Sequence, residues 1–317
     1  MKNISLIATL VSTALFATTS YADTNNIDPV PSVESPTTET MGPPDTHPVF
    51  GGSSDIISED MVLNVPTDFP DMNAAMRSLD DKRIKVGTTV TISVNECPSE
   101  EQMDPFVFNH PNGKSIHVIG GTESESCRLF FYRGVDGFVV NDGNTIGLID
   151  GFTLLGTTGY ISSGIVGRNG ATIKLGSNMR ISGFYTGVRA ENNATIIANG
   201  IQSTLNTDGG FYSSKGGLIE ANNAVASYNG QYGFLAEQNG SIEAFRSTAA
   251  GNGTTAYETR TGGFVDASFG SVPEFSPIPL RASSRGLINA FGISLSGGFI
   301  IERDEKSHGV ITNERKF

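Results

Sequence analysis

A short glycine-led pattern recurs through this chain at a constant step. Its regular copies open at Gly164, Gly187, Gly210 and Gly233. The differences 187−164, 210−187 and 233−210 all equal 23. A looser first copy opens at Gly137, where 164−137 equals 27, and a last copy is expected at Gly263, where 263−233 equals 30. Self-similarity at such a period predicts a solenoid, in which each unit stacks on its neighbours instead of folding alone.

Two features within each copy indicate strands joined by tight turns. Apolar residues alternate, as in residues 233–237, which is the two-residue period of a β-strand. Six residues after each opening glycine comes a residue that adopts positive φ at little cost: Gly143, Gly170, Asn193, Gly216 and Asn239. A second file, Asn206, Asn229 and Asn252, predicts a ladder of stacked side-chain amides.

These features predict an all-β, right-handed parallel β-helix with coils about 4.8 Å apart. On the first sheet of each coil, the expected interior file is Phe138, Ile165, Val188, Phe211, Phe234 and Phe264. Small residues share that strand: Gly167, Ala190, Ser213 and Ala236. On the second sheet the expected file is Ile146, Ile173, Ile196, Ile219 and Ile242. A β-sandwich is the alternative, but sandwiches do not keep turn residues in constant register.

The ends of the chain differ in composition from the repeats. Residues 1–22 combine an early lysine, an apolar run and a small-x-small site, which predicts a secretory signal peptide. Residues 23–60 are acidic and rich in Pro, Thr and Ser, which is typical of a disordered linker. We therefore expect the β-helix domain at residues 61–289 and a C-terminal cap or attachment segment at residues 290–317. The predicted location is secreted, periplasmic or on a bacterial cell surface.

Cysteines and charge limit the chemistry. Cys97 and Cys127 are the only cysteines, and in an exported protein they are expected to form a disulfide, although a pair of free thiols is the alternative. The net charge of −12 argues against nucleic acid or an anionic membrane as the main partner, and it disfavours dense polyanions. The four histidines are scattered, so no metal site is expected, and the signal sequence is too short to insert as a membrane span.

A helix is expected at the N-terminal end of the coil. It would begin with Asp68 as its acidic cap, and Met72, Ala75, Met76 and Leu79 would form its apolar face. Solenoids need such covers because an open sheet edge promotes aggregation. We therefore expect this helix to close the coil, with no other role.

The order of motifs along the chain resembles a known family. The motifs are VPTDFP at 65–70, NAAM at 73–76, TVTISV at 89–94, HPNG at 110–113, IHVIG at 116–120, IDGFTL at 149–154 and GFVDA at 263–267. This order resembles the pectin-lyase-like β-helix modules of bacteriophage tail fibres and prophage-derived surface proteins. The resemblance spans roughly residues 62–290 and implies a glycan-contacting surface module, often a homotrimer. The signal peptide departs from tail fibres, which assemble in the cytoplasm.

In a β-helix the inward files form the core, so a binding site must use outward side chains or loops. The outward files of the first sheet are expected to contain Val139, Val166, Arg189, Tyr212, Leu235 and Val265, and Asn141, Arg168, Glu191, Ser214, Glu237 and Ala267. Among them, the candidate ligand-binding residues are Arg168, Arg189, Glu191, Tyr212 and Glu237. A solvated face with cross-strand ion pairs, such as Arg168 with Glu191, is the alternative. An insertion at residues 251–261 would bring Tyr257 and Arg260 over this face, or form an inert loop.

Relatives on this scaffold cleave acidic polysaccharides, so catalysis is the competing hypothesis. A lyase would need a basic residue and clustered carboxylates that hold Ca²⁺, and a hydrolase would need two carboxyl groups about 5 to 9.5 Å apart. Arg189, Glu191 and Glu237 are the candidate catalytic residues, and Glu191 lies two coils, or about 9.6 Å, from Glu237. Carboxylates are sparse here. The sequence therefore favours an exported protein that binds glycans or mediates adhesion without a cofactor, with a polysaccharide lyase or glycoside hydrolase and a structural spacer as alternatives.

Overall fold

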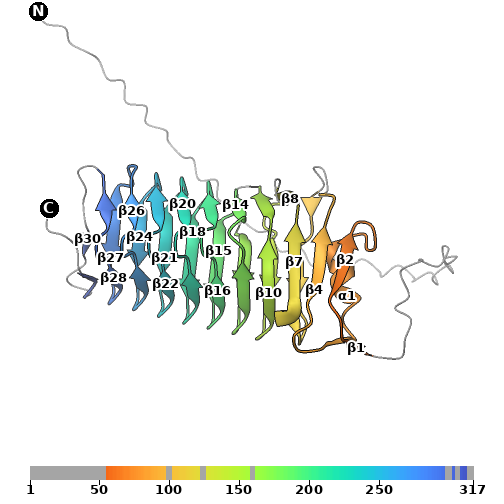
Figure 1. The fold of residues 1–317 in the computed structure, drawn as a ribbon. Helices are drawn as coiled ribbons and strands as arrows, with labels where there is room; N and C mark the ends of the chain where they lie inside the picture. The colour runs from red at the N-terminus through yellow and green to blue at the C-terminus, as the bar shows by residue number, and fades with distance from the viewer. Residues whose placement is uncertain are drawn as a thin grey trace, which may run out of the picture. The chain divides into compact units, whose positions relative to one another are not determined.

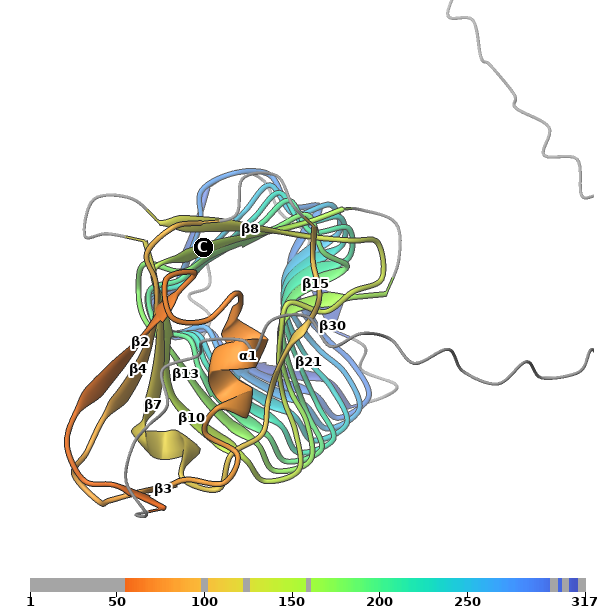
Figure 2. The same ribbon diagram turned by 90° about the vertical axis from the view of Figure 1, so that its right-hand side faces the viewer.

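The protein is a right-handed parallel β-helix. The computed structural model describes residues 55–97, 102–121, 126–157, 161–296, 302–303 and 308–312. Three parallel sheets run side by side along the axis, and strands of the same sheet come from successive coils (Figure 1). Viewed from the N-terminal strands, the chain turns clockwise from the second sheet through the third to the first as it recedes (Figure 2). The predicted fold class is therefore confirmed.

The described strands alternate among the three sheets in chain order. Sheet 1 contains β6 (Phe106–Phe108), β9 (Phe138–Val140), β12 (Ser163–Gly167), β15 (Thr186–Glu191), β18 (Gly209–Ser214), β21 (Tyr232–Ala236), β24 (Thr255–Thr259), β27 (Ile278–Ala282) and β30 (Glu302–Arg303). Sheet 2 contains β2 (Met61–Val65), β4 (Val90–Val94), β7 (Ile116–Gly120), β10 (Thr145–Asp150), β13 (Thr172–Leu175), β16 (Thr195–Ile197), β19 (Leu218–Glu220), β22 (Ser241–Glu243), β25 (Phe264–Asp266), β28 (Leu287–Asn289) and β31 (Val310–Thr312). Sheet 3 contains β5 (Gln102–Met103), β8 (Cys127–Phe131), β11 (Phe152–Gly156), β14 (Arg180–Ser182), β17 (Gln202–Thr204), β20 (Val225–Ser227), β23 (Thr248–Ala250), β26 (Ser271–Val272) and β29 (Ser294–Leu295).

The interior of sheet 1 is one continuous file of buried side chains. Ile165 pairs with Val188, Val188 with Phe211, and Phe211 with Phe234, as the constant step predicts. The rings of Phe211 and Phe234 are stacked, with centroids 4.8 Å apart and planes 9° apart. Because that distance equals the strand spacing, coil geometry and ring stacking reinforce each other.

The last predicted copy is wrong, and the regular step continues where an insertion was expected. Phe234 pairs with Tyr257, and Tyr257 with Leu280, so that 257−234 and 280−257 both equal 23. Phe264 instead lies in β25 of sheet 2, opposite Ser241. The true copy was hidden because Ala256 stands where earlier copies have glycine. Tyr257 is therefore a core residue, fully buried and stacked on Phe234 at 5.1 Å.

Because the last copy begins at Ala256 and not at Gly263, the last residue of each outward file also differs from the prediction. Val265 and Ala267 were expected on the outer face of sheet 1, but both are fully buried beyond it, Val265 in β25 and Ala267 directly after that strand. Glu258 pairs with Leu235 and takes the place expected for Val265. Arg260 follows Glu237 at the same constant step and takes the place expected for Ala267.

Turn residues keep the register of the coils. Every predicted left-handed residue has positive φ, from 62° at Asn239 to 78° at Gly170. The asparagine ladder is also present, because Nδ2 of Asn206 donates to Oδ1 of Asn229 at 2.9 Å and Nδ2 of Asn229 donates to Oδ1 of Asn252 at 3.0 Å. All three asparagines are buried, so the ladder satisfies polar groups that would otherwise destabilise the fold.

The N-terminal end of the coil is covered by a helix, as predicted, but the helix begins later. Helix α1 spans Met72–Arg77, and its N-cap is Asp71, whose carboxylate accepts from the backbone N–H of Ala74 at 2.7 Å. Asp68 instead accepts from both the backbone and the side chain of Asn64. The predicted apolar face is buried, and Figure 2 shows α1 across the end of the coil. A short parallel pair, β1 (Ile56–Ile57) with β3 (Arg83–Ile84), and the 3-10 helix η1 (Gly113–Ser115) complete this end.

The predicted disulfide is present. Cys97, three residues beyond β4, is bonded to Cys127 at the start of β8. It closes a loop of 30 residues, which corresponds to roughly 3 to 4 kcal/mol of stabilisation in the chain-entropy treatment. Beyond the last regular coil, β29, β30 and β31 add one further strand to each sheet. The predicted signal peptide, and the linker up to residue 54, lie outside the described residues.

Candidate functional site

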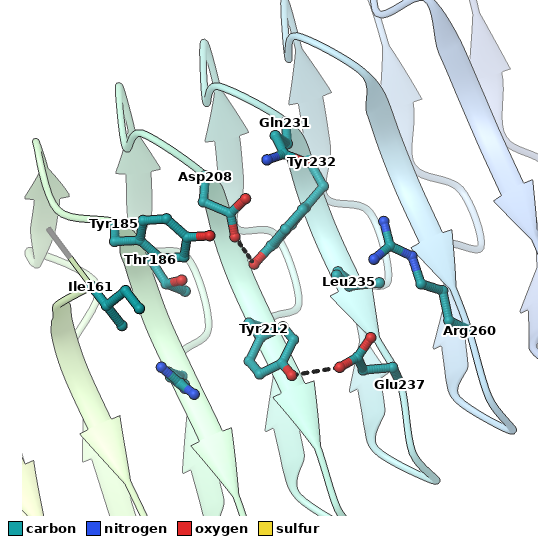
Figure 3. Close-up of a pocket in the computed structure, with 11 residues that line it drawn as sticks. Ile161, Tyr185, Thr186, Asp208, Tyr212, Gln231, Tyr232, Leu235, Glu237 and Arg260 are labelled. Carbon is teal, nitrogen blue, oxygen red and sulfur yellow. Dashed lines mark hydrogen bonds between the residues drawn. The ribbon is translucent and has the colours of Figure 1, made fainter. Parts of the chain in front are cut away.

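A hollow of about 330 Å³ interrupts the outer face of sheet 1. It extends over β15, β18 and β21 and includes residues from the turns before these strands, together with Arg260, which directly follows β24 (Figure 3). Its lining residues are Ile161, Tyr185, Thr186, Arg189, Asp208, Tyr212, Gln231, Tyr232, Leu235, Glu237 and Arg260. Aromatic, cationic and anionic groups thus surround one depression on an otherwise regular sheet.

Two tyrosine–carboxylate pairs shape the hollow, one at each end of the strands. Tyr232 Oη donates to Asp208 Oδ2 at 2.8 Å, and Tyr212 Oη donates to Glu237 Oε1 at 2.7 Å (Figure 3). Both pairs join the neighbouring coils that contain β18 and β21. The ring centroids of Tyr212 and Tyr232 lie 6.4 Å apart. Each carboxylate accepts from a neutral donor and keeps further lone pairs for a ligand hydroxyl.

Arg189 connects the hollow to an ion-pair network along its edge. Its Nη2 donates to Glu191 at 2.7 Å, and its guanidinium lies 5.4 Å from the centre of the Tyr212 ring. Glu191 is also 3.7 Å from Arg168, which bonds Asp136 at 3.0 Å. The predicted pair between Arg168 and Glu191 is therefore present, but these two residues lie beside the hollow and do not line it.

A second cluster borders the hollow toward the C-terminal coils. Glu258 is only 2% exposed, although it belongs to the outward file. Its carboxylate accepts from Nε of Arg260 at 2.6 Å and from Thr255 at 2.8 Å, and Arg281 lies 3.7 Å away. Two arginines neutralise this buried acid, which would otherwise be costly to enclose. Arg260 remains 40% exposed and lines the hollow.

Enclosure changes the ionisation of the hollow. Burial, together with the neighbouring Glu237, raises the pKa of Tyr212 to about 12, and burial beside Asp208 raises the pKa of Tyr232 far above its usual value. Both phenols are therefore neutral hydrogen-bond donors at physiological pH. Burial also raises the pKa of Asp208, against the opposing effect of the Tyr232 hydrogen bond.

Three of the five predicted ligand-binding residues gather in the hollow: Arg189, Tyr212 and Glu237. Asp208 and the tyrosines before the opening glycines were not predicted. A signal was present, because Tyr185, Asp208 and Gln231 follow one another at the constant step of the repeat. These positions lie in the turns before the strands. There the strand alternation does not predict whether a side chain points inward or outward. Arg260 lines the hollow, which was one of the two outcomes expected for residues 251–261, but it does so from a regular coil.

The carboxylates of this face are held apart and engaged with partners. Asp208 lies opposite Gln231, and Glu237 lies opposite Ser214, so the two acids are one coil apart and six positions apart along the strand direction, or about 20 Å between Cα atoms. Glu191 is bonded by Arg189 and Glu258 by Arg260. Among the described residues, no group of three or more His, Cys, Asp or Glu side chains is placed to hold a metal ion. The arrangement provides donors and acceptors for hydroxyl groups at fixed positions.

Comparison with protein-family models, with curated proteins and with solved structures finds no match for this chain. The resemblance to pectin-lyase-like modules is therefore supported only at the level of a parallel β-solenoid. Of the described helices, none has the length and apolar character needed to cross a membrane.

Proposed function

We propose that this protein is an exported β-helix that binds glycans through the hollow on the outer face of sheet 1. The observation that carries the proposal is the composition of that hollow, in which three tyrosines, two arginines and two carboxylates line one depression. Aromatic rings with polar edges and convergent hydrogen-bonding groups are typical of sites for polar, ring-shaped ligands. Sugars have this character, since their rings present apolar C–H faces and hydroxyl edges.

The charges favour a neutral or sparsely charged sugar chain. Arg189 and Arg260 are balanced within the hollow by Asp208 and Glu237, and the whole chain carries a net charge of −12. A dense polyanion would be repelled by this field. The parallel strands also extend the face along the helix axis, so that successive coils contact successive parts of a linear ligand.

Binding without cleavage is favoured over hydrolysis or elimination because the acids have structural partners. A hydrolase needs two carboxyl groups about 5 to 9.5 Å apart with one free to protonate the leaving group. Glu191 and Glu237, the predicted pair, are bonded by Arg189 and Tyr212. A purely structural spacer would have no need for buried charge on its outer face.

Retention on a panel of polysaccharides tests the proposal. The full chain is expected to bind at least one neutral or sparsely charged polysaccharide without shortening it. New reducing ends, or the absorbance of unsaturated uronides, would establish a hydrolase or a lyase instead. Failure to bind any member of a panel that includes cello-, xylo-, chito- and galacturono-oligosaccharides would contradict glycan binding.

Export and assembly belong to the same proposal. The predicted signal peptide and the disulfide between Cys97 and Cys127 fit an oxidising compartment. The tail-fibre-like resemblance implies a homotrimer, which sedimentation analysis of the purified protein would detect.

A further inference from the structure

A second apolar surface adjoins the hollow, at the turn that leads from sheet 3 into sheet 1. Tyr228 directly follows β20 and lies four residues before Tyr232, so their Cα atoms are at most about 14 Å apart. Tyr228 is 53% exposed, and Leu205, its equivalent one coil earlier, is 60% exposed. Large apolar side chains therefore remain at the surface in two successive coils beside the site.

The backbone at these two positions favours smaller, polar residues. Leu205 has φ 57° and Tyr228 has φ 56°, whereas the next coil has Gly251 at the same position with φ 61°. A bulky residue in the left-handed region is uncommon and strained. Local preference therefore does not account for an exposed leucine and tyrosine at these turns, and a surface role does.

The ring of Tyr228 occupies a defined place across the next coil. A Cβ atom added to Gly251 would lie 2.7 Å from both Cδ1 and Cε1 of Tyr228, so the glycine leaves room for the ring. The hydroxyl of Tyr228 donates to Glu274 Oε2 at 2.5 Å, and Glu274 lies one coil beyond Gly251. Contact with Gly251 and the bond to Glu274 hold the ring along the helix axis, although more than half of its surface is exposed.

We propose that Tyr228 is a stacking platform for a second sugar unit of the glycan that occupies the hollow. This inference rests on the proposed glycan binding. An immobilised aromatic ring binds the apolar face of a sugar at a low cost in conformational entropy, because the ring is already fixed. Tyr228 lies three residues before Gln231, and Leu205 three residues before Asp208, so a sugar chain that leaves the hollow at that end passes over the turn and meets Tyr228. Leu205 extends the same apolar surface by one coil.

A single tryptophan provides a direct test, because the chain contains none. In the full chain with Tyr228→Trp, the only tryptophan reports on the platform, while calorimetry of the same sample reports on binding anywhere. The probes are cellohexaose, xylohexaose, chitohexaose and hexagalacturonate, each compared with its disaccharide. We expect a blue shift of the tryptophan emission with the hexasaccharide that gives heat, and a weaker response to the disaccharide.

The outcomes separate the two proposals. Heat of binding with no change in emission would overturn the platform and leave the hollow as a glycan site. Neither heat nor an emission change with any of the four hexasaccharides, for this variant and for the unsubstituted protein, would overturn both. An emission change that follows addition of a second protein but no sugar would identify the surface as a protein contact and overturn the platform.

Substitutions at the same position quantify the contact. Tyr228→Ala should weaken hexasaccharide binding about five- to tenfold, the size of one aromatic contact, and leave disaccharide binding unchanged. Tyr228→Phe keeps the ring and removes only the bond to Glu274, so it is the matched control and should bind nearly as well as the original protein. Equal loss in both variants, or loss in neither, would contradict a stacking role.

Discussion

The inner and outer files of sheet 1 come from the same strands but follow different rules. Inside, the file from Ile165 to Tyr257 consists of apolar side chains of different size, apart from the Tyr257 hydroxyl that bonds Ser247, and its rings stack at about the coil spacing. Outside, the neighbouring file changes character at every coil: Val166, Arg189, Tyr212, Leu235 and Glu258. Packing at high density restricts the first file, whereas the second is free to acquire binding chemistry. The repeat therefore supports the fold, and departures from the repeat on the outer face define the site.

The largest effect is expected inside. Phe234→Ala removes a fully buried ring that stacks between Phe211 and Tyr257, and should lower the free energy of unfolding by about 3 to 5 kcal/mol. Chemical denaturation of the purified variant measures this. A loss below about 1 kcal/mol would show that the inner file does not determine stability.

The amide ladder should be the next most sensitive feature. Asn229→Ala removes an acceptor for both the backbone and the side chain of Asn206, and leaves these donors buried. We expect a loss of about 1 to 3 kcal/mol in the free energy of unfolding. Gln231→Ala, an exposed amide of the same coil, is the matched control and should cost less. Equal losses would indicate that the ladder has no special role.

On the outer face, substitutions are expected to lower glycan affinity more than the free energy of unfolding. Arg189→Ala should weaken glycan binding about tenfold, equivalent to about 1.4 kcal/mol, and change the free energy of unfolding by less than about 1 kcal/mol. Stability changes little because the enclosed Nε of Arg189 has no hydrogen-bond partner in the described protein, which offsets part of the gain from Glu191. Arg189→Lys keeps the charge but not the planar group, and isolates the contribution of geometry. Unchanged affinity would remove Arg189 from the site.

The smallest effect should come from the ionisation of Asp208. Burial raises its pKa in the folded protein above the unfolded value, so the folded state binds the proton more tightly. This contribution to stability is complete below the unfolded pKa and is lost as pH rises through the folded pKa. Asp208→Asn should therefore be slightly more stable than the original at pH 7, with the difference shrinking toward pH 3. A difference that grows on acidification would contradict a raised pKa.

Much of the fold follows from the sequence, because a core of stacked files requires residues that repeat. The positive-φ turn file, the Asn206–Asn229–Asn252 ladder and the disulfide all follow from spacing or residue type. The prediction failed at Ala256, where one methyl group hid a copy of the pattern and placed Phe264 in the wrong sheet.

The candidate site was less predictable. Arg189 and Tyr212 lie on strands and Glu237 directly follows β21, so the alternation that separates inside from outside identified all three. Asp208 and Tyr185 lie at turns, and the approach of Asp208 to Tyr232 depends on how the chain bends there. Which outward residues form a hollow depends on the sizes of side chains in neighbouring coils, and no single-strand pattern reports that.

The most direct test of the division between the two files is to measure affinity and stability on one variant. In the double variant Arg189→Ala with Tyr212→Ala, calorimetric titration with the bound oligosaccharide and chemical unfolding are carried out on the same preparation. We predict that affinity falls more than about tenfold while the free energy of unfolding stays within about 1 kcal/mol of the original. Unchanged affinity, or a loss of stability as large as that of Phe234→Ala, would contradict this division.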